Sequence, residues 1–303
     1  MMAPLASPLL AVLGRATTDF FGAGVRLSEL RSRNELAEVS VQVGGAGAIA
    51  AVTAAAMDCD VRFCAKIADD FLGRFIVEGL RSANIDTSLI VTGTGRLSPF
   101  SFTAIDKSGE SCAFTTAGDV LPMQKDEIEI DLLLDGVLAL LLDGSDPATQ
   151  AVAAEVASER DIPVIVDAGD LREGTGELIA LADVLISSER LASEIAPRGE
   201  LQDSLIELQQ LGPRSVIITM GEAGSIGLHD DQLVQQPPLS VRAISDTAGA
   251  GHVYHGAFAS AMLHGDEFAR CMEFATIAAG LSCTEIGALA GIPERDDVLS
   301  RMQ

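Results

Sequence analysis

The segment SDTAGAGHVYHGAFASAML, at residues 245–263, contains the residue types best suited to chemistry. Three small residues, Gly249, Ala250 and Gly251, precede an apolar helical pattern, so they open a predicted helix. The first N–H groups of a helix have no partner within it, and the helix dipole there favours negative charge. Glycine also lets an anion approach the backbone closely. The segment therefore predicts a phosphate-binding site, with a plain helix start packed through small residues as the alternative.

The elements that must position this helix start alternate along the chain. The predicted strands are apolar runs, separated mostly by helical patterns, at residues 132–144, 162–169, 182–188 and 215–221. Such alternation predicts a parallel sheet with helices on both faces. Another short apolar run at residues 9–14 predicts a strand, and Asp19 follows it near the edge where open α/β sheets bind ligands. We therefore expect a three-layer α/β/α core with a mostly parallel central sheet.

Two segments interrupt this pattern, at about residues 20–43 and 92–117. They contain alternating runs such as VSVQV and SFTAID, which are typical of exposed strands outside the main sheet. We found no repeat of solenoid length and no low-complexity linker. The sequence therefore predicts a single domain over residues 1–303 with a small lid of inserted β-strands.

Composition and charge exclude several classes of function. The formal charge of −24 repels nucleic-acid backbones and anionic lipid, and no run of Lys or Arg offsets it. A phosphate site must therefore depend on local backbone donors, arginines and a cation. The five cysteines are scattered without metal-ligand spacing, which predicts reduced, mostly buried thiols. The apolar N-terminal stretch has no preceding positive charge and is too short to span a bilayer, so we expect a cytoplasmic protein.

The segment at residues 245–263 resembles the DTxGAGDxFxGAF signature of the ribokinase-like (PfkB) carbohydrate kinases. The matching residues are Asp246, Thr247, Gly249, Ala250, Gly251, Gly256, Ala257 and Phe258. Three further motifs are similar to family motifs in the same order, namely Gly44 and Gly45, then Asp69, Asp70 and Gly73, then Thr219, Gly221 and Gly224. The resemblance covers nearly the whole chain. Within the family, LSCTEIGALAGIP, SSERLA and HGAF are similar to the bacterial 6-deoxy-6-sulfofructose kinases.

The resemblance implies an ATP-dependent kinase that phosphorylates a hydroxyl of a small sugar or sugar derivative. It implies Mg²⁺ on the nucleotide phosphates, K⁺ beside Asp246 as in many members, a closing lid and a homodimer that pairs through that lid. The implied binding residues are Asp19, Gly44, Gly45 and Ile49 for the sugar, Gly249, Ala250 and Gly251 for the transferring phosphoryl group, and Thr219, Gly221, Gly224, Asp246 and Thr247 for the nucleotide and its cations.

The most consequential departure from the family pattern is His252. It stands directly after GAG, where the family has the aspartate that accepts the proton of the attacking hydroxyl. A neutral imidazole at a helix N-terminus can still accept a proton, since the dipole disfavours the imidazolium. Two points count against His252 as the base. The adjacent triphosphate favours the imidazolium form, and the ring places its nitrogen at a different position from the oxygen of an aspartate. General-base help contributes about 10²–10⁴ in rate, so loss of the aspartate is compatible with slower turnover.

Two further departures concern the sugar and the metal. Ile49 stands where the family has a polar asparagine that touches the sugar. Ser188 and Leu191 stand where many members have an NxxE motif, which leaves Glu189 as the nearest carboxylate for magnesium. Together with His252, these residues favour a rival interpretation, a kinase-fold protein that binds nucleotide or sugar without phosphoryl transfer.

Several other polar residues are open to a structural or a functional interpretation. Arg172 follows a strand end, where a guanidinium either faces a substrate anion or forms a surface ion pair. We expect His255 to be a packing or solvent-facing residue. Structural roles are also expected for Asp167 and Asp183, and for the turn residues Asp106, Gly109 and Glu110.

Overall fold

The centre of the molecule is an eight-stranded sheet in the order β14-β13-β12-β11-β10-β9-β1-β4. The computed structural model describes residues 7–25, 35–95, 97–106, 111–195, 200–241 and 243–302. From β4 to β12 the neighbouring strands are parallel, whereas β13 is antiparallel to both of its neighbours. The strands are β1 (Leu9–Leu13), β4 (Asp60–Cys64), β9 (Ala139–Leu142), β10 (Val164–Ala168), β11 (Val184–Ser188), β12 (Ser215–Thr219), β13 (Ser225–His229) and β14 (Gln232–Gln236).

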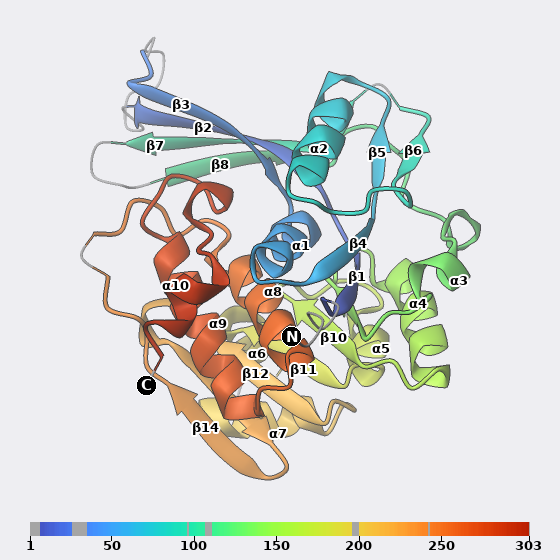
Figure 1. Ribbon diagram of the computed structural model, residues 1–303, viewed down its shortest axis with the longest axis vertical. Helices are drawn as coiled ribbons and strands as arrows, with labels where there is room; N and C mark the ends of the chain where they lie inside the picture. Colours follow the sequence, from blue (N-terminus) through green and yellow to red (C-terminus); the bar gives the residue numbers. More distant parts are fainter. Residues whose placement is uncertain are drawn as a thin grey trace, which may run out of the picture.

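Helices cover both faces of this sheet (Figure 1). Leu10 and Val12 of β1 belong to the apolar core under α1, α8 and α9, whereas Ala11 and Leu13 belong to the core under α4 to α7. This alternation is the two-residue period of a strand buried on both sides. The predicted three-layer core is confirmed. The helices are α1 (Ala46–Ala56), α2 (Phe71–Ser82), α3 (Ile130–Leu133), α4 (Pro147–Glu159), α5 (Thr175–Ala180), α6 (Glu189–Ile195), α7 (Leu201–Gln209), α8 (Ala250–Leu263), α9 (Phe268–Ser282) and α10 (Arg295–Leu299).

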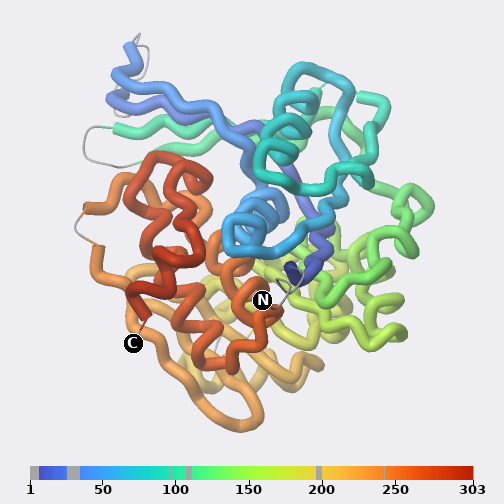
Figure 2. Tube along the Cα trace, in the orientation of Figure 1, coloured from blue at the N-terminus to red at the C-terminus, as the bar shows by residue number. Residues whose placement is uncertain are grey.

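A second sheet of four strands has the order β3-β2-β7-β8. Figure 2 shows these strands projecting from the main body of the chain. Most residues of these four strands lie within the two segments predicted as a lid, at about 20–43 and 92–117. Residues 26–34 and 107–110 lie outside the described part. A two-stranded ladder of β5 and β6 completes the strands. The bounds are β2 (Thr17–Val25), β3 (Glu38–Gly44), β5 (Lys66–Ala68), β6 (Val91–Gly93), β7 (Phe100–Asp106) and β8 (Ser111–Thr116).

Two local details differ from the sequence-based expectation. The run at 132–144 was predicted as one strand, but α3 covers its beginning and only Ala139–Leu142 is strand, because Gly136 turns the chain between them with a φ of 70°. The antiparallel hairpin of β13 and β14 was not predicted. It turns at Asp230 and Asp231, which both have positive φ, the conformation of a tight hairpin turn. Within the described ranges no helix has the length and apolar character needed to cross a membrane.

Asp70 fixes the start of α2, within a motif noted in the sequence. Its Oδ1 accepts hydrogen bonds from the Gly73 amide at 2.7 Å and the Ser98 hydroxyl at 2.6 Å, and its Oδ2 accepts one from the Ser98 amide at 3.1 Å. Partial burial raises the pKa of Asp70, but these hydrogen bonds outweigh it and hold that pKa below its ordinary value. Ionised Asp70 therefore stabilises the fold.

We predict that Asp70→Ala lowers the free energy of unfolding by about 1–2 kcal/mol at pH 7, measured by urea denaturation. This stabilisation is present above the unfolded-state pKa of the carboxyl and is lost as pH falls through the lower folded-state pKa. The difference between variant and parent should therefore shrink in acid. Asp69→Ala is the matched control, because the Asp69 side chain is 78% exposed and pairs only on the surface with Arg74. An equal loss from both variants would contradict the capping role.

Candidate active site

The start of α8 has the geometry of an anion site. Gly249 caps the helix with a φ of 79°, a left-handed conformation that favours glycine. Among the described residues, the backbone N–H groups of Gly251 and His252 have no hydrogen-bond acceptor. The helix is held against α1 at Gly256, where an added Cβ would lie 2.2 Å from the carbonyl oxygen of Ala50. Two unpaired donors thus lie at a fixed helix N-terminus, where the dipole favours an anion.

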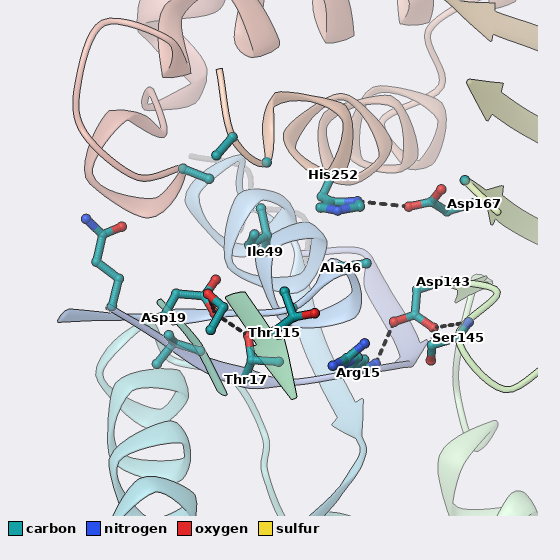
Figure 3. Close-up of a pocket in the computed structure, with 18 of the residues that line it drawn as sticks. Arg15, Thr17, Asp19, Ala46, Ile49, Thr115, Asp143, Ser145, Asp167 and His252 are labelled. Carbon is teal, nitrogen blue, oxygen red and sulfur yellow. Dashed lines mark hydrogen bonds and ion pairs between the residues drawn. The ribbon is translucent and has the colours of Figure 1, made fainter. Parts of the chain in front are cut away.

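A polar cavity of about 440 Å³ lies on one side of this helix start, between the second sheet and the carboxyl ends of β1, β9 and β10 (Figure 3). Its walls carry hydroxyl, carboxylate and guanidinium groups, which suit a ligand rich in hydroxyl groups. The lining residues include Arg15, Thr17, Asp19, Gln42, Gly45, Ile49, Ser101, Asp143, Ser145, Asp167, Arg172, Gly249 and His252.

A more apolar cavity of about 620 Å³ lies on the other side of the helix start. Its walls are mainly aliphatic and small side chains, and Glu222 is the single acid among the described residues that line it. Such walls suit a flat heteroaromatic ring. The lining residues include Thr219, Gly221, Gly224, Leu239, Val241, Ile244, Thr247, Ala250, Gly251, Tyr254, Ala279 and Cys283.

His252 faces a buried carboxylate across the boundary between α8 and β10 (Figure 3). Its Nδ1 lies 3.1 Å from Oδ2 of Asp167, and its side chain is 37% exposed. One helical turn later, Nε2 of His255 lies 3.3 Å from Oδ1 of the same aspartate. Asp167 and His255 are almost fully buried. From the sequence we expected a structural role for Asp167 and a packing or solvent-facing role for His255, and neither expectation places them beside His252. His255 reaches the same aspartate because residues three apart on a helix lie on the same face.

The pKa values of this cluster follow from its charges. Burial raises the pKa of Asp167, but the two histidines outweigh it and hold that pKa below the ordinary value. Burial lowers the pKa of His252, but the hydrogen bond and charge of Asp167, with smaller effects of Asp143 and Asp19, leave that pKa above its ordinary value. The imidazole and the carboxylate therefore stabilise each other's charged forms.

Asp19 is held in the wall of the polar cavity by two hydroxyl groups. Its Oδ1 accepts hydrogen bonds from Thr17 at 2.7 Å and from Ser101 at 2.8 Å. Gly44 lies against it, since an added Cβ would come within 1.8 Å of Oδ2. Asp19, Gly45 and Ile49 line the cavity, as expected of residues around one ligand, whereas Gly44 makes room for the aspartate.

Asp143 and Arg15 were not singled out in the sequence. Asp143 is buried and accepts hydrogen bonds from the amides of Arg15 at 2.5 Å and Gly47 at 3.1 Å, and from the side chain of Gln150 at 2.7 Å. It thereby joins the ends of β1 and β9 to the start of α1. The one available signal was its place directly after an apolar run; Asp19 was noted on the related ground that it follows the run at 9–14 a few residues later.

Two other predicted residues are not among those that line the cavities. Asp246 shapes the loop before α8, because its carboxylate accepts from the amides of Ala248 and Gly287, each at 3.0 Å. Glu189 begins α6, is exposed and lines neither cavity; its role as a magnesium ligand stays a prediction.

Most of the remaining polar residues have structural contacts. Asp183 accepts from the Val164 amide at 2.8 Å, in keeping with a structural role. Arg172 lines the polar cavity and also pairs with Asp170 at 3.2 Å. Ser188 caps the Leu191 amide at 3.2 Å, and Leu191 is buried. Asp106 ends β7, while Gly109 and Glu110 lie outside the described residues.

Comparison with known proteins gives consistent matches over the length of the chain. Residues 7–295 match the model of the pfkB family carbohydrate kinases. The chain is 25% identical over 301 residues to a ribokinase of Staphylococcus aureus, covering 95% of this chain and 98% of that protein. It is 26% identical over 298 residues to 5-dehydro-2-deoxygluconokinase 1 of Bacillus cereus, covering 90% and 89%.

Solved structures show the same fold. A putative ribokinase from Agrobacterium tumefaciens superposes with a TM-score of 0.87 at 24% identity, over 97% of each chain. A ribokinase of Arabidopsis thaliana in complex with ribose and ATP superposes with a TM-score of 0.83 at 22% identity, over 97% of this chain and 98% of that one. These matches do not specifically support the narrower likeness to sulfofructose kinases, which stays a prediction.

Proposed function

Because this chain belongs to the pfkB family of carbohydrate kinases, we propose that it transfers the γ-phosphate of ATP to a hydroxyl of a small sugar or sugar derivative. The observation that carries the proposal is the start of α8, whose unpaired Gly251 and His252 amides lie between a polar and an apolar cavity. Phosphoryl transfer depends mainly on positioning and on donors aimed at the charge of the transferring group. A helix N-terminus between acceptor and nucleotide supplies both.

The apolar cavity is the proposed nucleotide site. Thr219, Gly221, Gly224 and Thr247 line it, and the aliphatic walls suit the adenine ring. Magnesium would neutralise charge on the nucleotide phosphates. Since Glu222 is the one acid among the described residues lining this cavity, phosphates and water would supply most of the ligands of the ion, as is common for Mg²⁺. A monovalent cation near Asp246 stays a prediction.

The polar cavity is the proposed acceptor site, with His252 as the base. With its Nδ1–H donated to Asp167, the ring keeps a lone pair on Nε2 that can take the proton of the attacking hydroxyl. Asp167 fixes this tautomer and orients the ring. Asp19 accepts hydrogen bonds and would receive one from a sugar hydroxyl. The side chain of Ile49 can neither donate nor accept a hydrogen bond, so we expect an acceptor without a polar group at that wall.

The proposal is tested by measuring ADP release from Mg·ATP against a panel of pentoses, ketohexoses, sugar phosphates and sugar acids. Acceptor-dependent ADP release, with a phosphorylated product seen by mass spectrometry, is the expected result. Binding of ATP or sugar by calorimetry without turnover on any acceptor would instead support the rival, a protein that keeps the fold and binds ligand without phosphoryl transfer.

Within the proposed function, Arg15 favours an acceptor that carries a negative charge. Its guanidinium lines the polar cavity, and among the described residues its hydrogen-bond partner is the Thr116 carbonyl at 3.4 Å. Arg172 lines the same cavity. Pairs of arginine with a carboxylate or phosphate are short and frequently bidentate. A guanidinium with one long hydrogen bond therefore has donors left for such an anion. One relative named above acts, by its name, on a gluconate derivative.

We predict that Arg15→Met raises the KM for the best anionic acceptor about 10–100-fold, the equivalent of a lost charged hydrogen bond. The KM for ATP should stay within about two-fold, which controls for folding of the site. If neutral sugars are the best acceptors and Arg15→Met leaves their KM unchanged, the charged acceptor is wrong while the kinase assignment stands.

We also propose that the chain forms a homodimer through the second sheet, which acts as a lid over the polar cavity. One face of this sheet carries Asp19 and Ser101 toward the cavity, while Val41 and Phe114 on the other face are 41% and 60% exposed. Exposed apolar residues on one sheet face mark an interface. The parent should be dimeric by light scattering and Phe114→Glu largely monomeric; a monomeric parent would sink the idea.

A further inference from the structure

We propose that Asp167, His252 and His255 form a binding site for a transition-metal ion of the Zn²⁺ class, open toward the polar cavity. The proposal stands on the geometry of these three side chains and does not require that the chain be a kinase. No magnesium role is involved, because imidazole nitrogen suits Zn²⁺, Cu²⁺ or Ni²⁺ whereas Mg²⁺ prefers oxygen ligands.

The three side chains present ligand atoms at separations that fit one small ion. One atom from each, two ring nitrogens and a carboxylate oxygen, all lie within 4.8 Å of one another. Nδ1 of His252 and Nε2 of His255 are 3.1 and 3.3 Å from the two oxygens of Asp167. Bonds of about 2.0–2.2 Å in a tetrahedral arrangement place ligand atoms roughly 3.3–3.6 Å apart. Binding an ion therefore requires side-chain rotations that shorten the longest of these separations, at most 4.8 Å, by about 1 Å.

The contacts of His255 supply an independent indication. Its Nδ1 lies 2.5 Å from the carbonyl oxygen of Gly251, so Nδ1–H donates there and Nε2 of the neutral ring carries the lone pair. That lone pair faces Oδ1 of Asp167 at 3.3 Å and the carbonyl oxygen of Ile186 at 3.4 Å. Nε2 thus faces two oxygens in a buried layer, a position where a metal ion would be surrounded by ligand and carbonyl oxygens. A backbone carbonyl is one of the common partners of the far nitrogen of a metal-bound histidine, together with carboxylates and water.

The cluster has the layout of an open metal site. Three protein ligands leave a fourth position for water or a hydroxyl, and Asp167 and His252 both line the polar cavity. The ion would therefore exchange through the cavity. Asp167 and His255 come from the buried layer between β10 and α8, which holds the site in shape before the ion arrives.

Metal binding and base catalysis by His252 exclude each other. An ion on Nδ1 displaces its proton, and the remaining proton of the neutral ring then lies on Nε2, the nitrogen that would accept the proton of an acceptor hydroxyl. A bound ion also occupies the floor of the polar cavity. The structure therefore assigns to Zn²⁺ the role of a reversible inhibitor of any turnover that uses His252.

The experiment measures Zn²⁺ binding to the metal-stripped full chain by isothermal titration calorimetry, with Co²⁺ absorption spectra as a report of nitrogen ligation. We expect one tight site per chain and a loss of at least about 100-fold in affinity for both His252→Gln and His255→Gln. His252 is partly exposed, so its variant should fold even where the buried His255 variant does not. The chain has four histidines, and His229→Gln and His264→Gln are the matched controls. Cys112→Ser controls for the exposed thiol.

The outcomes separate the two proposals. Tight binding that is lost in His252→Gln and kept in the three controls supports the site, whether or not the chain phosphorylates a sugar. Binding that persists in His252→Gln, that is lost in a control, or that is absent in the parent overturns it. If turnover is measurable, Zn²⁺ should inhibit the parent about ten-fold or more at saturation, and added chelator should restore the rate in the presence of excess Mg²⁺.

Discussion

His252→Gln should lower kcat about 10²–10⁴-fold while the KM for ATP stays within a few-fold. Glutamine can keep a hydrogen bond to Asp167 but cannot accept the proton of an attacking hydroxyl. The ring lines the polar cavity and leaves the apolar cavity untouched, so nucleotide binding should persist. The measurement is steady-state ADP release with calorimetry of ATP binding. A variant with unchanged kcat would show that His252 is not the base.

Asp167→Asn should reproduce part of this loss if Asp167 fixes the ring of His252. The amide cannot stabilise an imidazolium formed during proton transfer, and it leaves the tautomer of the ring undetermined. We expect kcat to fall about 10²-fold with little change in the KM for either substrate. Asp183→Asn is the matched control, since Asp183 holds a backbone amide near the other end of β10. A parallel loss of kcat and stability in both variants would indicate a structural role.

His252→Asp should not give a faster enzyme. A second carboxylate would face the buried Asp167, and two neighbouring carboxylates resist being ionised together. The double variant His252→Asp with Asp167→Asn removes this conflict and should recover activity relative to His252→Asp alone. Faster turnover by the single variant would show that Asp167 does not govern the site.

The structural features that could be predicted from the sequence are those set by residues close together in the chain. Gly249, Ala250 and Gly251 open a helix because the apolar period begins directly after them, and that period is local information. The parallel core was predictable for the same reason, since each apolar run and each helix carries its own pattern. The second sheet was visible as alternating runs, although the hairpin at Asp230 was not, because an Asp-Asp pair is a weak turn signal.

The residues that could not be predicted are those brought together by strand order. Asp167 lies 85 positions from His252, and Asp143 lies 96 positions from Gly47. The sequence around Asp143 or Asp167 does not indicate which helix these carboxylates will face. That depends on the strand order, which places β9 and β10 beneath α8. Glu189 shows the converse, since nearness in a motif did not bring its side chain to either cavity.

Gly251→Ala should lower kcat about 10²–10³-fold without destabilising the fold. An added Cβ at Gly251 meets no atom within 4 Å, so the protein has room for it, and alanine is favoured over glycine in a helix. The methyl group would instead be added to a residue that lines the apolar cavity and whose own amide is unpaired, next to the proposed position of the transferring phosphoryl group. Alanine keeps the amide, so the loss would come from the methyl group keeping the phosphoryl group out of hydrogen-bond reach, which costs as much as losing one donor, about 10²–10³ in rate.

Gly249→Ala is the informative comparison for this variant, because it should lower the stability of the fold. At a φ of 79° an alanine is strained, and its Cβ would lie 2.5 Å from Cβ of Ala288. We expect a loss of about 1–3 kcal/mol in unfolding free energy for Gly249→Ala and less than about 0.5 kcal/mol for Gly251→Ala, measured by urea denaturation. An inactive but fully stable Gly251→Ala would separate the anion site from the packing of α8. An active Gly251→Ala would return this segment to the plain helix start that its sequence also allows.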